Sequence, residues 1–278
     1  MNVDVDTALR QAAAAGLDRL DAQLLLAEVL GRPRSWLFAH GDAALTPPQA
    51  AHFAGWVARR AAGEPFAYLV GRKEFHGLAL DVGPAVLVPR PDTETLVDWA
   101  LDLLPADRPV QVADLGTGSG AIALALKHAR AHALVTATDL SAEALAVAAG
   151  NARRLQLDVA FAEGPWWAPL AGRKFDLVVS NPPYIAGGDP HLAALAHEPA
   201  LALTPGGDGL DAYRAIVAGA AAHLLPGGWL LFEHGHDQAG AVAALLHAAG
   251  FDTVATRADL AGVPRCTGGR CCIATSAG

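Results

Sequence analysis

The segment Val112-Ala-Asp-Leu-Gly116-Thr-Gly118-Ser-Gly120 is followed directly by the apolar run Ala121 to Leu126. This pattern predicts a buried strand, a tight turn and a helix. The glycines at positions 116, 118 and 120 let the backbone turn sharply and approach a ligand closely. The segment therefore predicts a ligand-binding turn between a strand and a helix.

Asp139 ends the next apolar run, Ala133 to Thr138. It follows the turn at about the distance at which nucleotide-binding folds place a carboxylate that binds ribose. The spacing Gly-x-Gly-x-Gly differs from the Gly-x-Gly-x-x-Gly of dinucleotide sites, and no lysine follows the turn as in a P-loop. A ligand with a ribose and no phosphates fits better, and S-adenosylmethionine is the candidate. The glycine spacing disfavours a nicotinamide-dependent dehydrogenase, which a comparison of S-adenosylhomocysteine and NAD binding would distinguish.

Beyond Pro109, strand and helix patterns alternate along the chain. Such alternation implies an α/β fold, a mostly parallel sheet with helices on both faces. The expected elements span 110–114, 121–130, 133–138, 141–156, 157–162, 175–180, 209–224, 228–233, 237–249, 251–256 and 270–275. The stretch 185–208 is the longest irregular segment, and we expect it to form a flap on the substrate side.

The first 75 residues show a different pattern, in which apolar segments with helical periodicity are separated by turn residues. Asp21 is expected to cap a helix that ends at Gly31, and Thr46 to cap another that opens with two prolines. We therefore expect a helical domain at 1–75, a β-hairpin linker at 76–91 and a larger α/β domain at 92–278.

The tetrapeptide Asn181-Pro182-Pro183-Tyr184 follows the apolar run Phe175 to Ser180, which predicts a buried strand. Asn181 is thus placed at the carboxyl end of a strand, where open α/β sheets bind ligands. Its side-chain amide and the carbonyl of Pro182 offer two acceptors beside the aromatic ring of Tyr184, which suits a planar NH2 group. An isolated tetrapeptide of this kind is more often a proline turn, but the glycine-rich segment upstream favours a methyl acceptor site.

With these features the chain resembles the bacterial protein-glutamine N5-methyltransferases, which methylate peptide chain release factors. The resemblance runs from Asp21 to Cys272, and the tetrapeptide alone marks a broader set of amino-methyltransferases. The other matching segments are Gly63-Glu-Pro65, Gly71-Arg-Lys-Glu-Phe75, Val88-Pro-Arg-Pro-Asp-Thr-Glu94, Glu198-Pro199, Gly206-Gly-Asp-Gly-Leu210 and Glu233-His-Gly235. The segment from Val88 to Glu94 and the N-terminal region make the resemblance specific to this family. Val88 to Glu94 is expected to line the cofactor pocket or to shape the cleft between the domains.

The resemblance implies the seven-stranded, Rossmann-like fold of S-adenosylmethionine-dependent methyltransferases, with its last strand antiparallel and a small N-terminal helical domain that grips the release factor. It implies that the cofactor S-adenosyl-L-methionine contacts Gly116, Thr117, Gly118, Ser119, Gly120, Asp139, Trp166 and Asn181. Asn181, Pro182, Pro183 and Tyr184 are expected to bind the substrate glutamine, with Asn181, Pro182 and Tyr184 as the catalytic residues.

One position departs from the family pattern. Trp166 aligns with an aromatic residue beside the adenine, but Pro165 stands where the family usually has an acidic residue. Glu163 or the backbone is left to supply the adenine contact. Trp167 is expected to be a core residue.

The composition fits a cytoplasmic enzyme with a protein substrate. The formal net charge is −8, whereas proteins that bind nucleic acid usually carry a basic stripe. No apolar stretch is long enough to span a bilayer. The adjacent residues Cys271 and Cys272 are expected to point to opposite faces of a strand, which argues against a metal site that they share. We expect a monomer that acts on class I release factors, with no metal, no membrane association and no direct binding to nucleic acid.

Two alternatives remain at this point. The same tetrapeptide serves enzymes that methylate an exocyclic amine of adenine or guanine in nucleic acid, a function that the net charge disfavours. A catalytically silent scaffold that keeps a cofactor pocket is the other, and the intact glycine turn, Asp139 and Asn181 argue against it.

Overall fold

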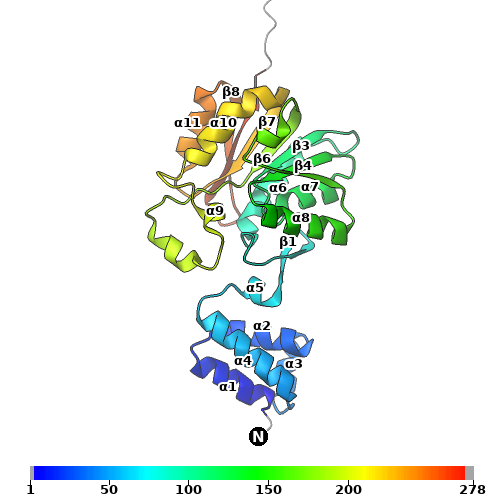
Figure 1. Cartoon of the computed structure of the whole chain (residues 1–278), viewed down its shortest axis with the longest axis vertical. Coiled ribbons are helices and arrows are strands. Elements are labelled where there is room, and N and C mark those ends of the chain that lie inside the picture. The colour runs from blue at the N-terminus through cyan, green and yellow to red at the C-terminus, as the bar shows by residue number, and fades with distance from the viewer. Residues whose placement is uncertain (1–2, 273–278) are drawn as a thin grey trace, which may run out of the picture. The chain divides into compact units, whose positions relative to one another are not determined.

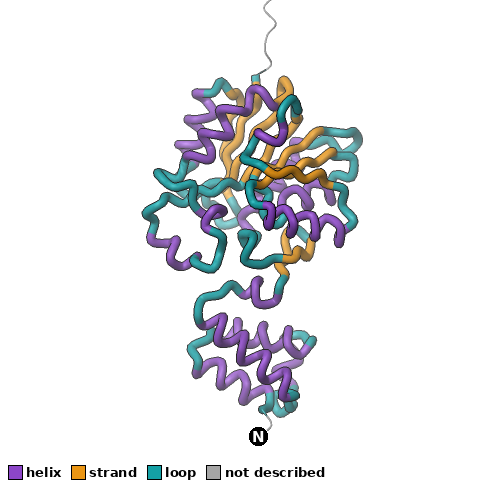
Figure 2. The backbone as a smooth tube through the Cα atoms, viewed as in Figure 1, coloured by secondary structure: helices purple, strands orange, loops and turns teal. Residues whose placement is uncertain are grey.

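The computed structural model describes residues 3–272 and divides into two compact units, residues 1–72 and 73–278 (Figure 1). The first unit is built of helices and the second around a sheet (Figure 2). Among the described residues, no helix is long and apolar enough to cross a membrane. The division into a recognition domain, a linker and a methyltransferase domain with the predicted boundaries stays a prediction.

The first unit has its own apolar core, which includes Leu25, Leu26 and Phe53. Its helices are α1 (Val5–Ala14), α2 (Arg19–Leu30), α3 (Arg34–Ala39), α4 (Pro47–Ala61) and α5 (Phe66–Val70). Thr46 caps α4 through a capping box with Gln49, and Gly31 ends α2 in the left-handed region, as expected.

The predicted cap of α2 is wrong. Asp18 caps this helix by accepting from the backbone N–H of Leu20 at 2.7 Å, because α2 begins at Arg19. Asp21 lies inside the first turn and pairs with Arg60 at 2.7 Å. A carboxylate also stabilises the positive end of the helix from that place, so the sequence pattern did not distinguish the two.

The second unit contains the predicted seven-stranded sheet, in the order β5-β4-β3-β6-β7-β9-β8. Its strands are β3 (Gln111–Leu115), β4 (Leu134–Asp139), β5 (Val159–Glu163), β6 (Phe175–Ser180), β7 (Leu224–Glu233), β8 (Phe251–Ala258) and β9 (Pro264–Cys271). All neighbours from β5 to β7 are parallel, and β9 is antiparallel to both β7 and β8. The strand order reverses between β3 and β6, and such a point opens a crevice at the carboxyl ends of the strands.

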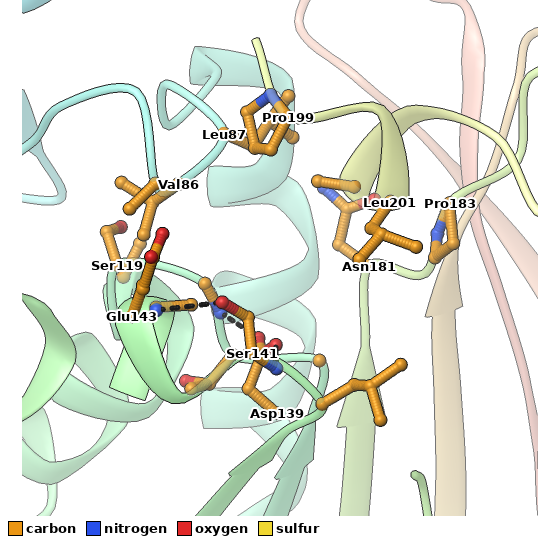
Figure 3. Close-up of a pocket in the computed structure, with 18 of the residues that line it drawn as sticks. Val86, Leu87, Ser119, Asp139, Ser141, Glu143, Asn181, Pro183, Pro199 and Leu201 are labelled. Atoms are coloured by element: carbon orange, nitrogen blue, oxygen red, sulfur yellow. Dashed lines mark hydrogen bonds between the residues drawn. The ribbon is translucent and has the colours of Figure 1, made fainter. Parts of the chain in front are cut away.

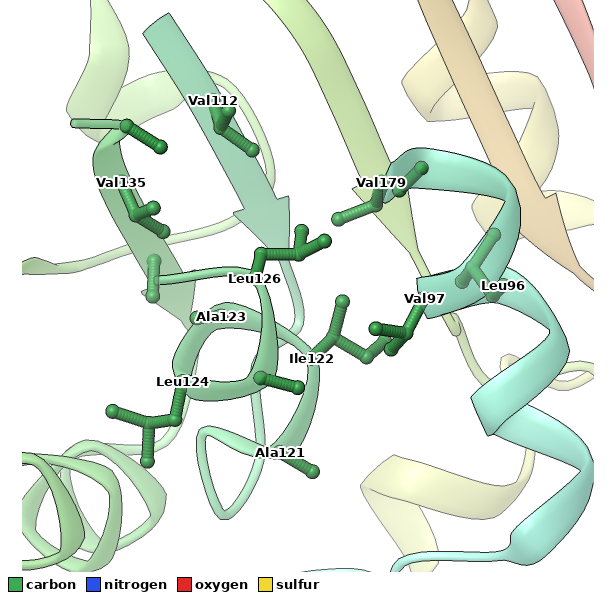
Figure 4. Packing of buried hydrophobic residues seen from close by; sticks show 14 of the residues in the cluster. Leu96, Val97, Val112, Ala121, Ile122, Ala123, Leu124, Leu126, Val135 and Val179 are labelled. Carbon is green, nitrogen blue, oxygen red and sulfur yellow. The ribbon is translucent and has the colours of Figure 1, made fainter. Parts of the chain in front are cut away.

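Helices cover both faces of this sheet, as the alternation predicted. They are α6 (Glu94–Leu103), α7 (Ala121–Ala129), α8 (Ala142–Leu155), α10 (Asp211–His223) and α11 (Ala239–Ala248). Successive residues of a strand face opposite sides, so Val179 packs in the core with α6 and α7, and Val178 in the core with α10 and α11. Figure 4 shows the first of these cores, where Ile122 and Leu126 of α7 lie between the strands and α6.

The hairpin predicted for the linker has its strands at β1 (Arg72–Phe75) and β2 (Leu78–Asp81), so it begins before residue 76. The predicted flap at 185–208 contains a 3-10 helix, η3 (Pro190–Leu195), and a short helix, α9 (Ala200–Leu203). Its ends are tied together, since Ile185 N–H donates to the Leu203 carbonyl at 2.9 Å.

The last strand lies earlier than expected, at Pro264–Cys271 rather than 270–275, and residues 273–275 are outside the described part of the chain. The strand is rich in small and polar residues, which hid it from an apolar pattern. Its place between two strands requires small residues, because a Cβ on Gly268 would lie 2.3 Å from Leu231 Cδ2 and 2.8 Å from the Leu230 carbonyl oxygen.

Candidate active site

A cavity of about 350 Å3 opens at the carboxyl ends of β3, β4 and β6 (Figure 3). It brings together Gly116 to Ser119, Asp139, Trp166, Asn181 and Pro183 from the predicted site. Its other lining residues are Pro84, Ala85, Val86, Leu87, Pro89, Arg90, Thr93, Ala121, Ile122, Leu140, Ser141, Glu143, Ala144, Gly164, Pro165, Pro199, Leu201 and Ala202. The predicted site residues Gly120, Pro182 and Tyr184 do not line it.

The glycine-rich turn is held against β4 by its backbone. The N–H groups of Gly116 and Thr117 both donate to the Thr138 carbonyl, each at 2.9 Å. Gly116 has a φ of 75°, and a Cβ there would lie 3.4 Å from the ring of Trp166. Glycine is therefore favoured at 116 by its left-handed backbone, whereas a Cβ there would make only an ordinary van der Waals contact with the tryptophan.

Gly120 lies outside the cavity lining, where α7 and α8 pack against each other. Its φ is 85°, and a Cβ would meet Leu124 Cδ1 at 3.0 Å and Ala148 Cβ at 3.2 Å. The absence of a side chain thus allows α7 and α8 to pack closely. Its predicted contact with a cofactor stays a prediction.

Asn151 of α8 fastens the turn from behind. Its fully buried amide donates to the carbonyls of Ser119 and Asp81, both at 3.0 Å, and accepts from the Asp81 N–H at 2.7 Å. The side chain thereby links the turn to the hairpin strand β2. Nothing in the local sequence around Asn151 indicated this contact, which joins residues 70 positions apart.

Asp114 lies beneath the turn and was not predicted as a site residue. Its Oδ2 accepts from Thr117 Oγ1 at 2.6 Å and from the Ala123 N–H at 3.2 Å. Its Oδ1 has no hydrogen-bond partner among the described residues. Burial raises the pKa of the Asp114 carboxyl to about 7, against the lowering effect of Thr117 and Ala123.

Asp139 ends β4 and faces the cavity. Its Oδ2 accepts from the Gly118 N–H at 2.8 Å, and its Oδ1 accepts from the Ser141 N–H at 2.9 Å (Figure 3). Ser141, rather than Asp139, caps α8 through the Ala144 N–H at 3.1 Å. Each carboxylate oxygen has a second lone pair, so Asp139 fixes the turn and still offers acceptors to a ligand.

The two tryptophans that follow β5 have different surroundings. Trp166 lines the cavity and has a φ of 43°, which is rare for a bulky residue. Trp167 is a core residue, as expected: its Nε1 donates to the Ile216 carbonyl at 2.9 Å and its ring stacks on His223. Glu163, one of the groups left to supply the adenine contact, is exposed and does not line the cavity. Glu143 of α8 does line it.

Asn181 lies across the cavity from Asp139, at the carboxyl end of β6 (Figure 3). Its Nδ2 donates to Thr93 Oγ1 at 3.3 Å. Pro182 is buried and Tyr184 half-buried. Burial raises the pKa of the Tyr184 hydroxyl to about 12, so this group stays protonated. The predicted catalytic and substrate-binding roles of these residues stay predictions.

Residues far apart in the sequence complete the wall beside Asn181. Glu198 is buried, accepts from the Val88 N–H at 3.0 Å and pairs with Arg90. Pro199 and Leu201 then enter the lining from α9 and its start. In the sequence, Val88 to Glu94 and Glu198-Pro199 pointed to this region only because they match the family pattern, and nothing indicated that they lie together.

The described residues hold no group of three or more His, Cys, Asp or Glu side chains that could bind a metal ion.

Two leucines that line the cavity, Leu140 and Leu201, are 58% and 70% exposed. The site therefore combines an apolar lining with a few oriented polar groups, the usual make-up of a small-molecule site.

Two family models match the chain: the PrmC N-terminal domain over residues 6–71 and the methyltransferase small domain over residues 93–209. The release factor glutamine methyltransferase of Xylella fastidiosa (strain Temecula1) is 53% identical over 95% of this chain and 97% of that protein. The release factor glutamine methyltransferase of Burkholderia pseudomallei is 52% identical over 95% of this chain and 96% of that protein.

Solved structures match the fold. A methyltransferase from Pyrococcus furiosus has a TM-score of 0.56 at 19% identity, over 79% of this chain and all of that chain. The 16S rRNA N2 G1207 methyltransferase of T. thermophilus, in complex with AdoMet and guanosine, has a TM-score of 0.55 at 22% identity, over 72% of this chain and 49% of that chain.

Proposed function

The chain belongs to the release factor glutamine methyltransferase family, and on that premise we propose that it methylates a release factor glutamine with S-adenosylmethionine as the donor. The acceptor is N5 of the glutamine in the Gly-Gly-Gln motif of class I peptide chain release factors. The observation that carries the proposal is that one cavity holds both Asp139 and Asn181, on opposite sides of the point where the strand order reverses.

The cavity fits this cofactor. A volume of about 350 Å3 lies in the range of small-molecule sites. The backbone of the turn at Gly116 lies beside the Trp166 ring, and both line the cavity. No lysine or arginine other than Arg90 lines the described cavity, and Arg90 is paired with Glu198. A ligand with a ribose, a flat base and no phosphates suits this combination.

When bound, S-adenosylmethionine supplies an electrophilic methyl group on a positively charged sulfur. Asp139 accepts hydrogen bonds from the ribose hydroxyls, and Trp166 packs against the adenine. Gly116 to Gly120 present their backbone to the methionine part. Pro165, which replaces the family's acidic residue, contributes an apolar edge to this part of the lining.

Asn181 and Pro182 act on the other substrate. An amide nitrogen is a poor nucleophile, because its lone pair is delocalised into the carbonyl. The Oδ1 of Asn181 and the carbonyl of Pro182 would accept hydrogen bonds from the two N–H groups of the substrate amide and so stabilise the positive charge that develops on its nitrogen. This nitrogen gains the methyl group as the bond from the methyl to sulfur breaks, and one N–H proton then passes to water. Tyr184 covers the plane of that amide, and the fixed alignment of the amide contributes by proximity.

The proposal is tested by incubating the protein and S-adenosylmethionine with a class I release factor and mapping the product by mass spectrometry. The expected result is a single methyl group on the Gly-Gly-Gln glutamine. An unmodified glutamine, together with measured S-adenosylhomocysteine binding, would contradict the substrate assignment. Methylation of an adenine or guanine amine in added RNA or DNA would then identify the alternative acceptor.

A further inference from the structure

Glu233 is a buried carboxylate that the proposed mechanism does not use. It is the last residue of β7, and β7 runs parallel to β6 with Phe232 beside Ser180. The residues that follow Ser180 and Phe232, Asn181 and Glu233, therefore come from adjacent strand ends. Glu233 is 1% exposed and does not line the cavity.

The strand register places Glu233 and Asn181 on the same face of the sheet. Val179 and Leu231 pack in the core with α6, and side chains two residues further along each strand share that side. The turn that precedes α6, η1 (Pro91–Thr93), contributes Thr93, whose Oγ1 accepts from Asn181 Nδ2 at 3.3 Å. Asn181 and Thr93 thus line the cavity and form a polar cluster with the buried Glu233 behind them.

Charged neighbours hold this cluster in place. Arg265 of β9 pairs with Asp92 of η1 at 3.1 Å, which ties the turn carrying Thr93 to the sheet. Glu233 Oε2 has no hydrogen-bond partner among the described residues. An unpartnered, buried carboxyl oxygen is costly and points to a role other than stability.

We propose that Glu233 is a positioning residue: its carboxylate, with the hydroxyl of Thr93, holds the NH2 end of the Asn181 side chain and so directs Oδ1 to the substrate amide. This inference rests on the proposed function of Asn181. An ionised carboxylate only accepts hydrogen bonds, so it faces Nδ2 and excludes the flipped amide. A protonated carboxyl donates as well and no longer selects one orientation.

The carboxyl changes charge in an accessible range. Burial raises the pKa of Glu233 to about 7, against the lowering effect of Thr93, Arg265 and Asn181, while the charge of Asp92 raises it further. The other titratable groups that face it are Tyr184, Tyr213 and Cys266, and burial raises the pKa of each above its usual value. Orientation of Asn181 should therefore weaken as the pH falls through about 7.

The test compares wild type with Glu233→Gln, whose amide both donates and accepts. We expect kcat to fall by roughly tenfold to a hundredfold, the scale seen when a group that orients a metal ligand is removed. KM for the release factor and the affinity for S-adenosylhomocysteine should change by less than about threefold, since Glu233 is buried and does not line the cavity. In wild type, log kcat/KM should fall below pH ~7, and this acid limb should be absent in the variant.

Controls separate this effect from others. Asp114 also has a pKa of about 7, so Asp114→Asn must keep the acid limb. Asp176→Asn, at the opposite edge of the sheet, should leave kcat and the pH profile unchanged, because within residues 3–272 the Asp176 side chain accepts only from the Gln111 N–H, at 2.8 Å. Thr93→Val should lower kcat and Thr93→Ser restore it. Unchanged kcat and acid limb in Glu233→Gln, or loss of the limb in Asp114→Asn, would overturn the inference.

A readout that needs no methyl transfer distinguishes this inference from the proposed function. The side-chain NH2 signals of Asn181, assigned by their loss in Asn181→Ala, should shift with an apparent pKa near 7 in 15N NMR spectra. The shift should disappear in Glu233→Gln. If wild type leaves the release factor unmodified but this titration is seen, only the proposed function fails. If methylation is seen and the signals do not titrate, only the role of Glu233 fails.

Discussion

Two buried carboxylates, Asp114 and Glu233, lie under the two halves of the cavity. Burial raises both pKa values to about 7, and each carboxyl has one oxygen without a partner among the described residues. Asp114 contacts Thr117 and Ala123, three and nine residues away in the sequence. The cluster at Glu233 instead joins Asn181 to Thr93, 88 residues away.

This difference shows how the two halves are encoded. The half at the ends of β3 and β4 includes contacts within a short stretch of chain, those of Asp114 with Thr117 and Ala123, although Asn151 also fastens its turn to β2. The half at the end of β6, backed by Glu233 of β7, depends on contacts between the sheet and the turn before α6. We therefore expect the first half to govern cofactor affinity and the second to govern turnover.

The largest expected effect is that of Asn181→Ala. Turnover should fall by about 10²- to 10³-fold, because an acceptor for the developing positive charge is lost. The affinity for S-adenosylhomocysteine should change little. Steady-state kinetics with a release factor measures turnover, and calorimetry measures the affinity for S-adenosylhomocysteine. Near-normal methylation would contradict the assignment of Asn181.

Glu233→Gln should raise stability while it lowers turnover. A pKa raised from 4.5 to about 7 means that the charged form costs the folded state about 3 kcal/mol. This cost is fully present above pH 7 and disappears as the pH falls toward 4.5, because the folded protein then binds the proton more tightly than the unfolded chain.

Denaturant unfolding of wild type and Glu233→Gln at pH 8 and pH 5 measures this difference. The variant should be more stable by up to about 3 kcal/mol at pH 8, with most of the gain lost at pH 5. An equal change at both pH values would show that the charge of Glu233 is not the cause.

Asp139→Ala should weaken S-adenosylhomocysteine binding by about tenfold to a hundredfold, the loss expected when hydrogen bonds to a charged group are removed. The turn also loses its bond from Gly118 to Asp139. Turnover at saturating cofactor should stay close to that of wild type. Calorimetry measures the affinity, with Asp158→Ala, an exposed aspartate before β5, as the control. A large fall in turnover with intact affinity would remove the distinction between the two halves.

The smallest effect is expected for Tyr184→Phe. The hydroxyl stays protonated because its pKa is about 12, so its removal takes away no charge and leaves the ring in place. Turnover should change by less than about tenfold between pH 7 and 9, within the range of one hydrogen bond. Tyr184→Leu should lower turnover more, and equal effects of the two variants would show that the ring does not cover the substrate amide.

Residues close together in the sequence were predictable. The strand, turn and helix around Gly116 and the strand before Asn181 follow from apolar runs bounded by glycine and proline. The cap of α2 and the place of β9 were not, since Asp18 and Asp21 offer the same chemistry and β9 has small, polar residues. The place of β9 depends on its tertiary packing between β7 and β8, whereas the cap of α2 depends on the residue at which the helix begins.

The sequence alone determined the fold class, the family and the identity of the groups offered to the ligands. Periodicity records which residues are buried, and glycine and proline record where the backbone turns. Only the tertiary structure decided which of those groups meet. It brought Thr93, Asn181 and Glu233 into one cluster and fixed the protonation range of two carboxyls, because burial and long-range neighbours depend on the completed sheet.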